Sequence, residues 1–146
     1  MTALGISGVE VSARAIWTHS QGVSFAGSGD DAGHVAATGA GVPSQRLRDL
    51  IGAAPIELLK LDIEGGEFSV LPDCDGALGN VRRIVMEVHM FEPSQRLGEL
   101  LLVLERNGFH YSLADLQPAV WLGSSSKPPF AACPCDRFLV TVFAWR

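Results

Sequence analysis

The sequence predicts an α/β fold in which a mostly parallel sheet ends in an antiparallel hairpin. Residues 58–63 form a short apolar run, the pattern of a strand covered on both faces, and a helical pattern begins soon after it. Residues 81–90 repeat this order, because they have the pattern of a strand and precede an amphipathic segment. With 146 residues, of which 47% are hydrophobic, the chain suffices for one core, so we expect a single domain over residues 1–146.

The first third of the chain predicts two short strands, a loop and a helix. Residues 9–17 and 22–25 have extended patterns, and the polar turn between them predicts a hairpin. Residues 26–41 are rich in Gly, Ala, Ser and Asp without periodicity, which indicates a loop. A short helix follows, with Ser44 as its expected N-cap and Gly52 as its expected stop.

The middle of the chain predicts two helices that flank the second strong strand. The first begins at about Glu67 and leads into a turn-rich connection over residues 72–80. The second spans residues 94–107, where leucines recur at helical spacing, and it ends at Gly108. This second segment has the clearest helical pattern in the sequence.

The last third of the chain predicts two strands around a long loop. Residues 109–113 have an extended pattern, and a stretch rich in Pro, Gly and Ser follows them. Residues 138–145 form an apolar final strand. Strands that alternate with helices and then end in two strands are typical of an α/β sheet with an antiparallel last strand.

Composition excludes several classes of function. The net charge of -5 and the pI near 5.2 argue against a nucleic-acid or anionic-membrane surface. No apolar run approaches the ~20 residues of a membrane span and no export leader is present, so we expect a cytoplasmic protein. The odd number of cysteines fits a reducing compartment. We interpret Cys133 and Cys135 as ordinary thiols, because a metal or redox site usually has two intervening residues.

Three carboxylates, Asp62, Glu64 and Glu67, crowd the carboxyl end of the central strand. In open α/β sheets this edge is where ligands bind. Asp62 and Glu64 point to one side if the strand persists, and the glycine pair after them allows a sharp turn. The alternative is that Asp62 caps the helix, Glu67 complements its dipole and Glu64 is solvated. We favour a site, because neighbouring carboxylates repel unless a cation, proton or hydroxyl lies between them.

The segment LLKLDIEGGEF, followed about twenty residues later by VMEVH, resembles the FkbM family of S-adenosylmethionine-dependent methyltransferases. The family pattern is roughly LLKxDxEGxE and then a strand with xxEvH. The matching residues are Lys60, Asp62, Glu64, Gly65, Glu67, Glu87 and His89. The resemblance covers about residues 8–90 and implies a Rossmann-like class I methyltransferase fold with S-adenosylmethionine as its cofactor.

The resemblance also implies elements that the sequence does not contain. Such a fold normally begins with a strand ending in a glycine-rich loop near the cofactor, and a second strand supplies an acid for the ribose. We therefore expect a partial methyltransferase domain, truncated at its N-terminus, and assign no cofactor-binding residues. The implied activity is O-methylation of a hydroxyl on a sugar or natural product. The alternative is a non-catalytic remnant that acts as a binding or interaction module.

The resemblance places the central strand beside the strand at 81–90, so Asp62, Glu64, Glu87 and His89 should converge as catalytic groups. His89 is the natural general base, because its unperturbed pKa is near ~6.5. A divalent cation held by the carboxylates is the alternative, since hard oxygen ligands suit Mg²⁺. We expect no metal.

The expected partner is a small-molecule acceptor, with Glu67 and Trp121 as substrate contacts. Trp121 lies in the late loop, and such loops often carry substrate contacts. A sheet without its first strand would also leave an open edge beside the central strand. Because an open edge recruits other chains, we expect self-association through it.

Overall fold

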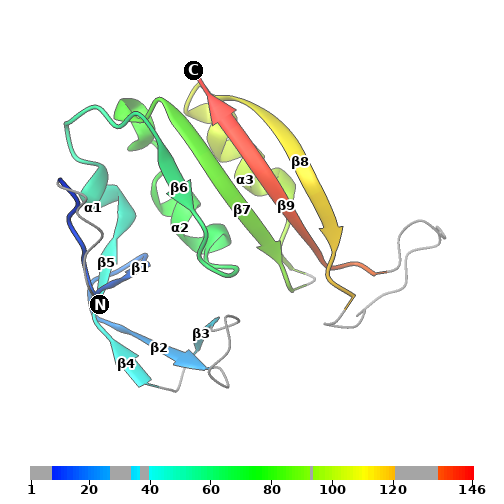
Figure 1. Cartoon of the computed structure of the whole chain (residues 1–146), viewed down its shortest axis with the longest axis horizontal. Helices are drawn as coiled ribbons and strands as arrows, with labels where there is room; N and C mark the ends of the chain where they lie inside the picture. Colours follow the sequence, from blue (N-terminus) through cyan, green and yellow to red (C-terminus); the bar gives the residue numbers. More distant parts are fainter. Residues whose placement is uncertain (1–7, 27–33, 37–39, 93, 121–134) are drawn as a thin grey trace.

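A four-stranded sheet forms the centre of the molecule (Figure 1). The computed structural model describes residues 8–26, 34–36, 40–92, 94–120 and 135–146. The strands of the main sheet lie in the order β6 (Leu59–Leu61), β7 (Arg83–Met90), β9 (Phe138–Trp145) and β8 (His110–Pro118).

The main sheet is mixed, so the expectation of a mostly parallel sheet is wrong. Only β6 and β7 pair in parallel, whereas β9 runs antiparallel to both of its neighbours, β7 and β8. The reason is that the last strand inserts between β7 and β8 and makes two antiparallel ladders instead of adding one at the edge. The α/β class and the antiparallel pairing of the last two strands are confirmed.

Strand β8 extends five residues beyond the predicted end at residue 113. Its pairing with β9 shifts register between Ala114 and Gln117, and Asp115 between them has a positive φ of 53°. This irregularity interrupts the two-residue alternation from which strands are recognised. The pattern therefore stops where the strand continues.

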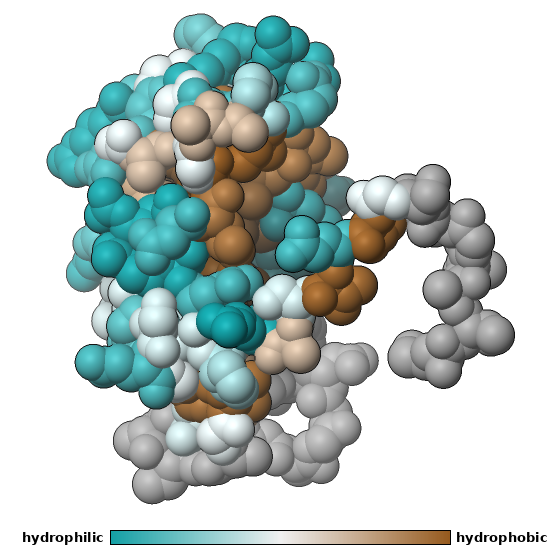
Figure 2. Space-filling model, turned by 90° about the vertical axis from the view of Figure 1, so that its left-hand side faces the viewer, coloured by the Kyte–Doolittle hydropathy of each residue, from teal (hydrophilic) through white to brown (hydrophobic). Residues whose placement is uncertain are grey.

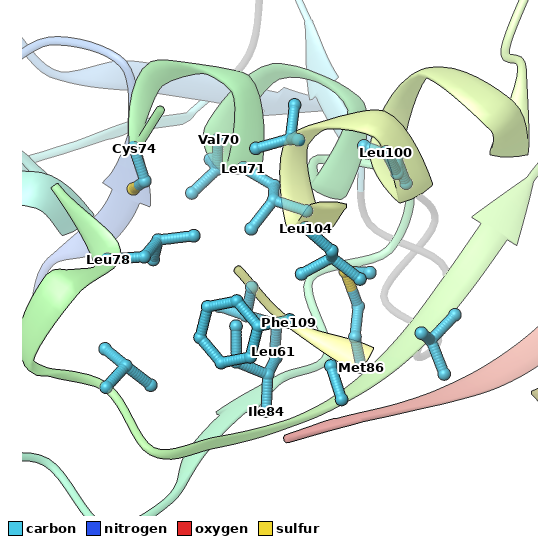
Figure 3. Close-up of a cluster of buried hydrophobic side chains, with 14 of the residues drawn as sticks. Leu61, Val70, Leu71, Cys74, Leu78, Ile84, Met86, Leu100, Leu104 and Phe109 are labelled. Carbon is cyan, nitrogen blue, oxygen red and sulfur yellow. The ribbon is translucent and has the colours of Figure 1, made fainter. Parts of the chain in front are cut away.

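Two helices cover one face of the sheet and bury the core against it. These are α2 (Glu67–Asp73) and α3 (Leu97–Arg106), close to the helices predicted from Glu67 and over 94–107. Figure 3 shows their apolar side chains meeting those of the sheet, and the labelled residues are Leu61, Val70, Leu71, Cys74, Leu78, Ile84, Met86, Leu100, Leu104 and Phe109. Each of these side chains is almost completely shielded from solvent. The leucine spacing in α3 thus reports a buried helix face, as predicted.

The N-terminal strands pair differently from the prediction. β1 (Ala15–Trp17) pairs in parallel with β5 (Ser44–Arg46), whereas β2 (Val23–Ala26) lies between β3 (His34–Ala36) and β4 (Ala40–Val42). The predicted hairpin of residues 9–17 with 22–25 is therefore wrong, because both edges of β2 are occupied by other strands. The prediction of a loop over 26–41 is also wrong where β3 and β4 form.

Ser44 belongs to β5 and is not the N-cap of the following helix. The helix α1 (Leu47–Ile51) has Arg46 at its N-cap and ends at Gly52, as predicted for its end. The Ser44 hydroxyl donates to the carbonyl of His19 (2.6 Å) and accepts from the N–H of Gly22 (2.9 Å). The serine therefore ties the turn before β2 to β5, a long-range role that a local capping pattern does not reveal.

Short connections complete the fold. Arg46 makes two hydrogen bonds to the carboxylate of Asp73 (3.1 and 2.6 Å) and so joins β5 to α2. A 3₁₀ helix, η1 (Leu78–Asn80), precedes β7.

Among the described residues, no helix has the length and apolar character needed to cross a membrane. Figure 2 shows a hydrophobic band, flanked by hydrophilic surface, on the side where α1 and β5 lie.

Candidate functional site

The candidate site lies where β6 ends beside β7 (Figure 1). Leu61 pairs with Met86, so Asp62 follows β6 next to Glu87 of β7. Asp62, Glu87 and His89 each offer one ligand-type atom, and these atoms all lie within 4.8 Å of one another. The structure therefore brings together carboxylates and an imidazole from two strands, as the sequence pattern predicts. Their catalytic roles stay predictions.

A turn places Glu64 at this site, and not the alternation of side chains along a strand. β6 ends at Leu61, and Glu64 adopts a left-handed backbone conformation with φ 52°, followed by Gly65 with φ 89°. For a residue other than glycine, this conformation costs roughly 1 to 3 kcal/mol and usually marks a position that its surroundings impose. The turn directs the Glu64 carboxylate to 3.6 Å from Nε2 of His89.

The buried carboxylate of Glu67 holds this turn in place. It accepts hydrogen bonds from the N–H groups of Ile63 (2.9 Å) and Gly65 (3.0 Å). Its side chain has no exposed surface, although charged side chains are rarely buried without partners. The two N–H donors and its place in the first turn of α2 compensate for the loss of water.

Two expectations about these carboxylates need correction. A side chain without exposed surface does not meet a substrate in this conformation, so Glu67 has a structural role here instead of the expected substrate contact. Asp62 does not cap α2 either, because the N-cap position is Gly66 and no side chain caps the helix. The alternative assigned to Asp62 is thereby excluded, whereas Glu67 does lie in the first turn.

His89 lies between two carboxylates. Its Nε2 is 3.6 Å from Glu64 and its Nδ1 is 3.5 Å from Oε1 of Glu67, and its side chain is 4% exposed. The contact with Glu67 is electrostatic, because Nδ1 makes no regular hydrogen bond within the described part of the chain. Burial opposes protonation of the imidazole, but the attraction of Glu67, Glu64 and Asp62 outweighs it, so the pKa of His89 is raised.

Lys60 supplies the positive charge at the open side of the site. Its Nζ lies 2.8 Å from Asp62 and 3.6 Å from Glu87. The hydrogen bond to Asp62 raises the pKa of the Lys60 ammonium. Oxygen and imidazole ligands of the kind that bind divalent cations are gathered here, but the lysine already contacts both exposed carboxylates. Arg82 and Arg83, just before and at the start of β7, form ion pairs with Glu57 instead of Glu87.

A pocket of about 200 Å³ opens beside Glu64. Its lining is mostly apolar and comes from β1, β2 and the turn after β6: Ala15, Ile16, Trp17, Phe25, Ile63, Glu64 and Gly66. We did not predict Trp17 and Phe25 as site residues from the sequence, because an aromatic residue in a short strand is more often part of a core. Trp121, the predicted substrate contact, lies outside the described residues.

Gln95 is a further residue that the sequence pattern does not identify. Its carbonyl oxygen accepts from the N–H groups of Phe91 (2.7 Å) and Glu92 (2.8 Å), and its Nε2 lies 3.4 Å from the carbonyl of Gly65. The side chain thus links the turn after β7 to the turn after β6. In the sequence, Gln95 belongs to the start of a helical pattern, which gives no sign of this contact.

Comparison with known families gives a match. The family model described as Methyltransferase FkbM domain matches residues 8–111, which include β1, the turn after β6 and the whole of β7 and α3. Comparisons with curated proteins and with solved structures each gave no match. The matched range thus contains every side chain described above as part of the site.

Proposed function

Because the chain belongs to the FkbM methyltransferase family, we propose that it methylates a hydroxyl oxygen of a sugar or natural product with S-adenosylmethionine as methyl donor. The position of His89 between Glu64 and Glu67 is the observation that supports this proposal best. O-methylation requires that the acceptor hydroxyl lose its proton, and an imidazole with carboxylates on either side is suited to receive it.

The pocket that Glu64 lines does not offer a complete site for S-adenosylmethionine. The pocket beside Glu64 is about 200 Å³, below the roughly 300 to 1,000 Å³ of typical small-molecule sites. Within the described residues, the glycine pair between β6 and α2 belongs to the turn beside His89, and we assign no cofactor-binding loop. We therefore assign only the acceptor side of the reaction to these residues and derive no step on the donor.

Glu64 and His89 have different roles in the removal of the proton from the acceptor hydroxyl. Glu64 lines the pocket with a side chain that is 33% exposed, so it is the group that an acceptor hydroxyl would contact. His89 lies behind it, and its Nε2, 3.6 Å from the Glu64 carboxylate, can draw the proton onward from that carboxylate. Glu67 holds the imidazole from the other side and stabilises its charged form.

Calorimetry followed by a transfer assay tests the proposal. Titration of the chain with S-adenosylmethionine should release heat, and incubation with labelled donor and a panel of hydroxyl compounds should yield labelled product. Replacing His89 by Gln should lower the transfer rate by about 10² to 10⁴. A matched control is Glu57→Gln, an exposed carboxylate in the bend before β6. No heat at millimolar donor and no labelled product would reject the proposal for this polypeptide.

A further inference from the structure

The site contains an arrangement of ligand atoms that could hold a divalent cation. Asp62 and Glu87 offer hard oxygen ligands, and His89 offers a nitrogen, with the three atoms within 4.8 Å of one another. The His89 imidazole is almost fully buried and has a carboxylate, Glu67, behind its other nitrogen. In metal sites a carboxylate at that position commonly orients the histidine ligand.

Lys60 occupies the open side of this arrangement. Lys60 pairs with Val85 in the parallel ladder, so Lys60, Asp62 and Glu87 project from the same face of the two strands. Helices α2 and α3 pack on the opposite face, through Leu61 and Met86. Among the ion pairs of the described residues, Lys60 is the cation that contacts Asp62 and Glu87.

We propose that Lys60 is the built-in counter-ion of the Asp62 and Glu87 carboxylates and takes the place that a divalent cation would otherwise have. Two negative charges so close together repel each other unless a positive charge lies between them, and the ammonium supplies it. The lysine is thus a positioning residue that keeps both carboxylates beside His89 and makes them poor ligands for metal ions. This inference concerns the same site as the proposed function but does not depend on methyl transfer.

Binding of Mn²⁺ to the unliganded chain tests the inference directly. The chain with Lys60 should bind Mn²⁺ weakly, and Lys60→Met should bind it about ten-fold more tightly, as measured by calorimetry and by the Mn²⁺ electron paramagnetic resonance signal. Adding Asp62→Asn to Lys60→Met should abolish the gain. Lys60→Arg should show no gain, because the positive charge remains.

Two controls separate this result from a general change in charge or fold. Arg83→Met removes an exposed cation from the start of β7, where it pairs with Glu57, and should leave Mn²⁺ affinity unchanged. Circular dichroism should show that all variants are folded. Equal Mn²⁺ affinity of the starting chain and folded Lys60→Met, or an equal gain from Arg83→Met, would overturn the inference. Neither donor nor acceptor is used, so failure of the proposed function would not affect the outcome.

Discussion

Oε1 of Glu67 lies 3.5 Å from Nδ1 of His89, and the same carboxylate accepts hydrogen bonds from the N–H groups of Ile63 and Gly65. One buried side chain therefore determines both the shape of the turn after β6 and the electrostatic environment of the imidazole on β7. The turn in turn places Glu64 against the other nitrogen of His89. This coupling between the two strand ends is the basis of the first two predictions.

Replacement of Glu67 by Gln should destabilise the fold. The amide has one oxygen for two N–H donors, and its NH₂ group would face another donor, so a buried polar group loses its partner. We expect the free energy of unfolding in urea to fall by about 2 kcal/mol. Glu57→Gln, at an exposed position, should change it by less than about 0.5 kcal/mol. An equal effect of the two substitutions would contradict this role of Glu67.

The stability and activity of the chain should depend on the protonation of His89 in opposite directions. Burial lowers the pKa of His89, but the negative charges of Glu67, Glu64 and Asp62 raise it by more, so the pKa is raised overall. Its protonated form therefore contributes stability that is complete below the unfolded pKa of ~6.5 and is lost as pH rises through the folded value. Methyl transfer, which needs the neutral imidazole, should increase over that same range.

Titration of the His89 ring by NMR measures this pKa. We expect a midpoint above ~6.5 in the starting chain and a lower one in Glu67→Gln, because a stabilising negative charge is removed. In His89→Gln, the pH dependence of unfolding should become flatter across this range. A midpoint at or below the ordinary value would show that burial outweighs the carboxylates.

A methyl group at Gly65 should disturb the turn. Gly65 has φ 89°, and an added Cβ would lie 3.4 Å from Nε2 of Gln95 and 3.6 Å from the carbonyl oxygen of His89. We expect Gly65→Ala to cost about 1 to 2 kcal/mol, mainly from the backbone conformation. Gly98→Ala is a matched control at an exposed position of α3 with open space around it, and it should stabilise the fold by up to about 1 kcal/mol. Thermal or urea unfolding of both variants should show a lower free energy of unfolding for Gly65→Ala and a higher one for Gly98→Ala.

The free edge of β6 should promote self-association. β6 pairs only with β7 among the strands that the structure describes, and Leu58, just before it, is 54% exposed. An unpaired edge with an adjacent apolar side chain is a template for another chain. We expect light scattering to show concentration-dependent association, and Leu58→Lys to reduce it. A monomer at all concentrations would contradict the prediction.

Several features of the fold follow from the sequence because they depend on local periodicity. The leucines of α3 recur along one helix face, and the apolar strand at the C-terminus spans the predicted residues 138–145 as β9. The charged turn after β6 also has a local signature, since two glycines and three carboxylates follow an apolar strand. Together with the strand neighbours that the family resemblance implies, these patterns predict that Asp62, Glu64, Glu87 and His89 converge at one sheet edge.

Pairing between distant segments was decided only by the tertiary structure. The pattern of a strand does not specify its neighbour, so the position of β9 between β7 and β8, the two partners of β2 and the role of Ser44 in β5 could not be predicted. The sequence also does not specify which charged side chains contact one another. The sequence contains Lys60 and Glu67 beside the other motif residues, but only packing distances show that Lys60 contacts two carboxylates while Glu67 is buried behind His89.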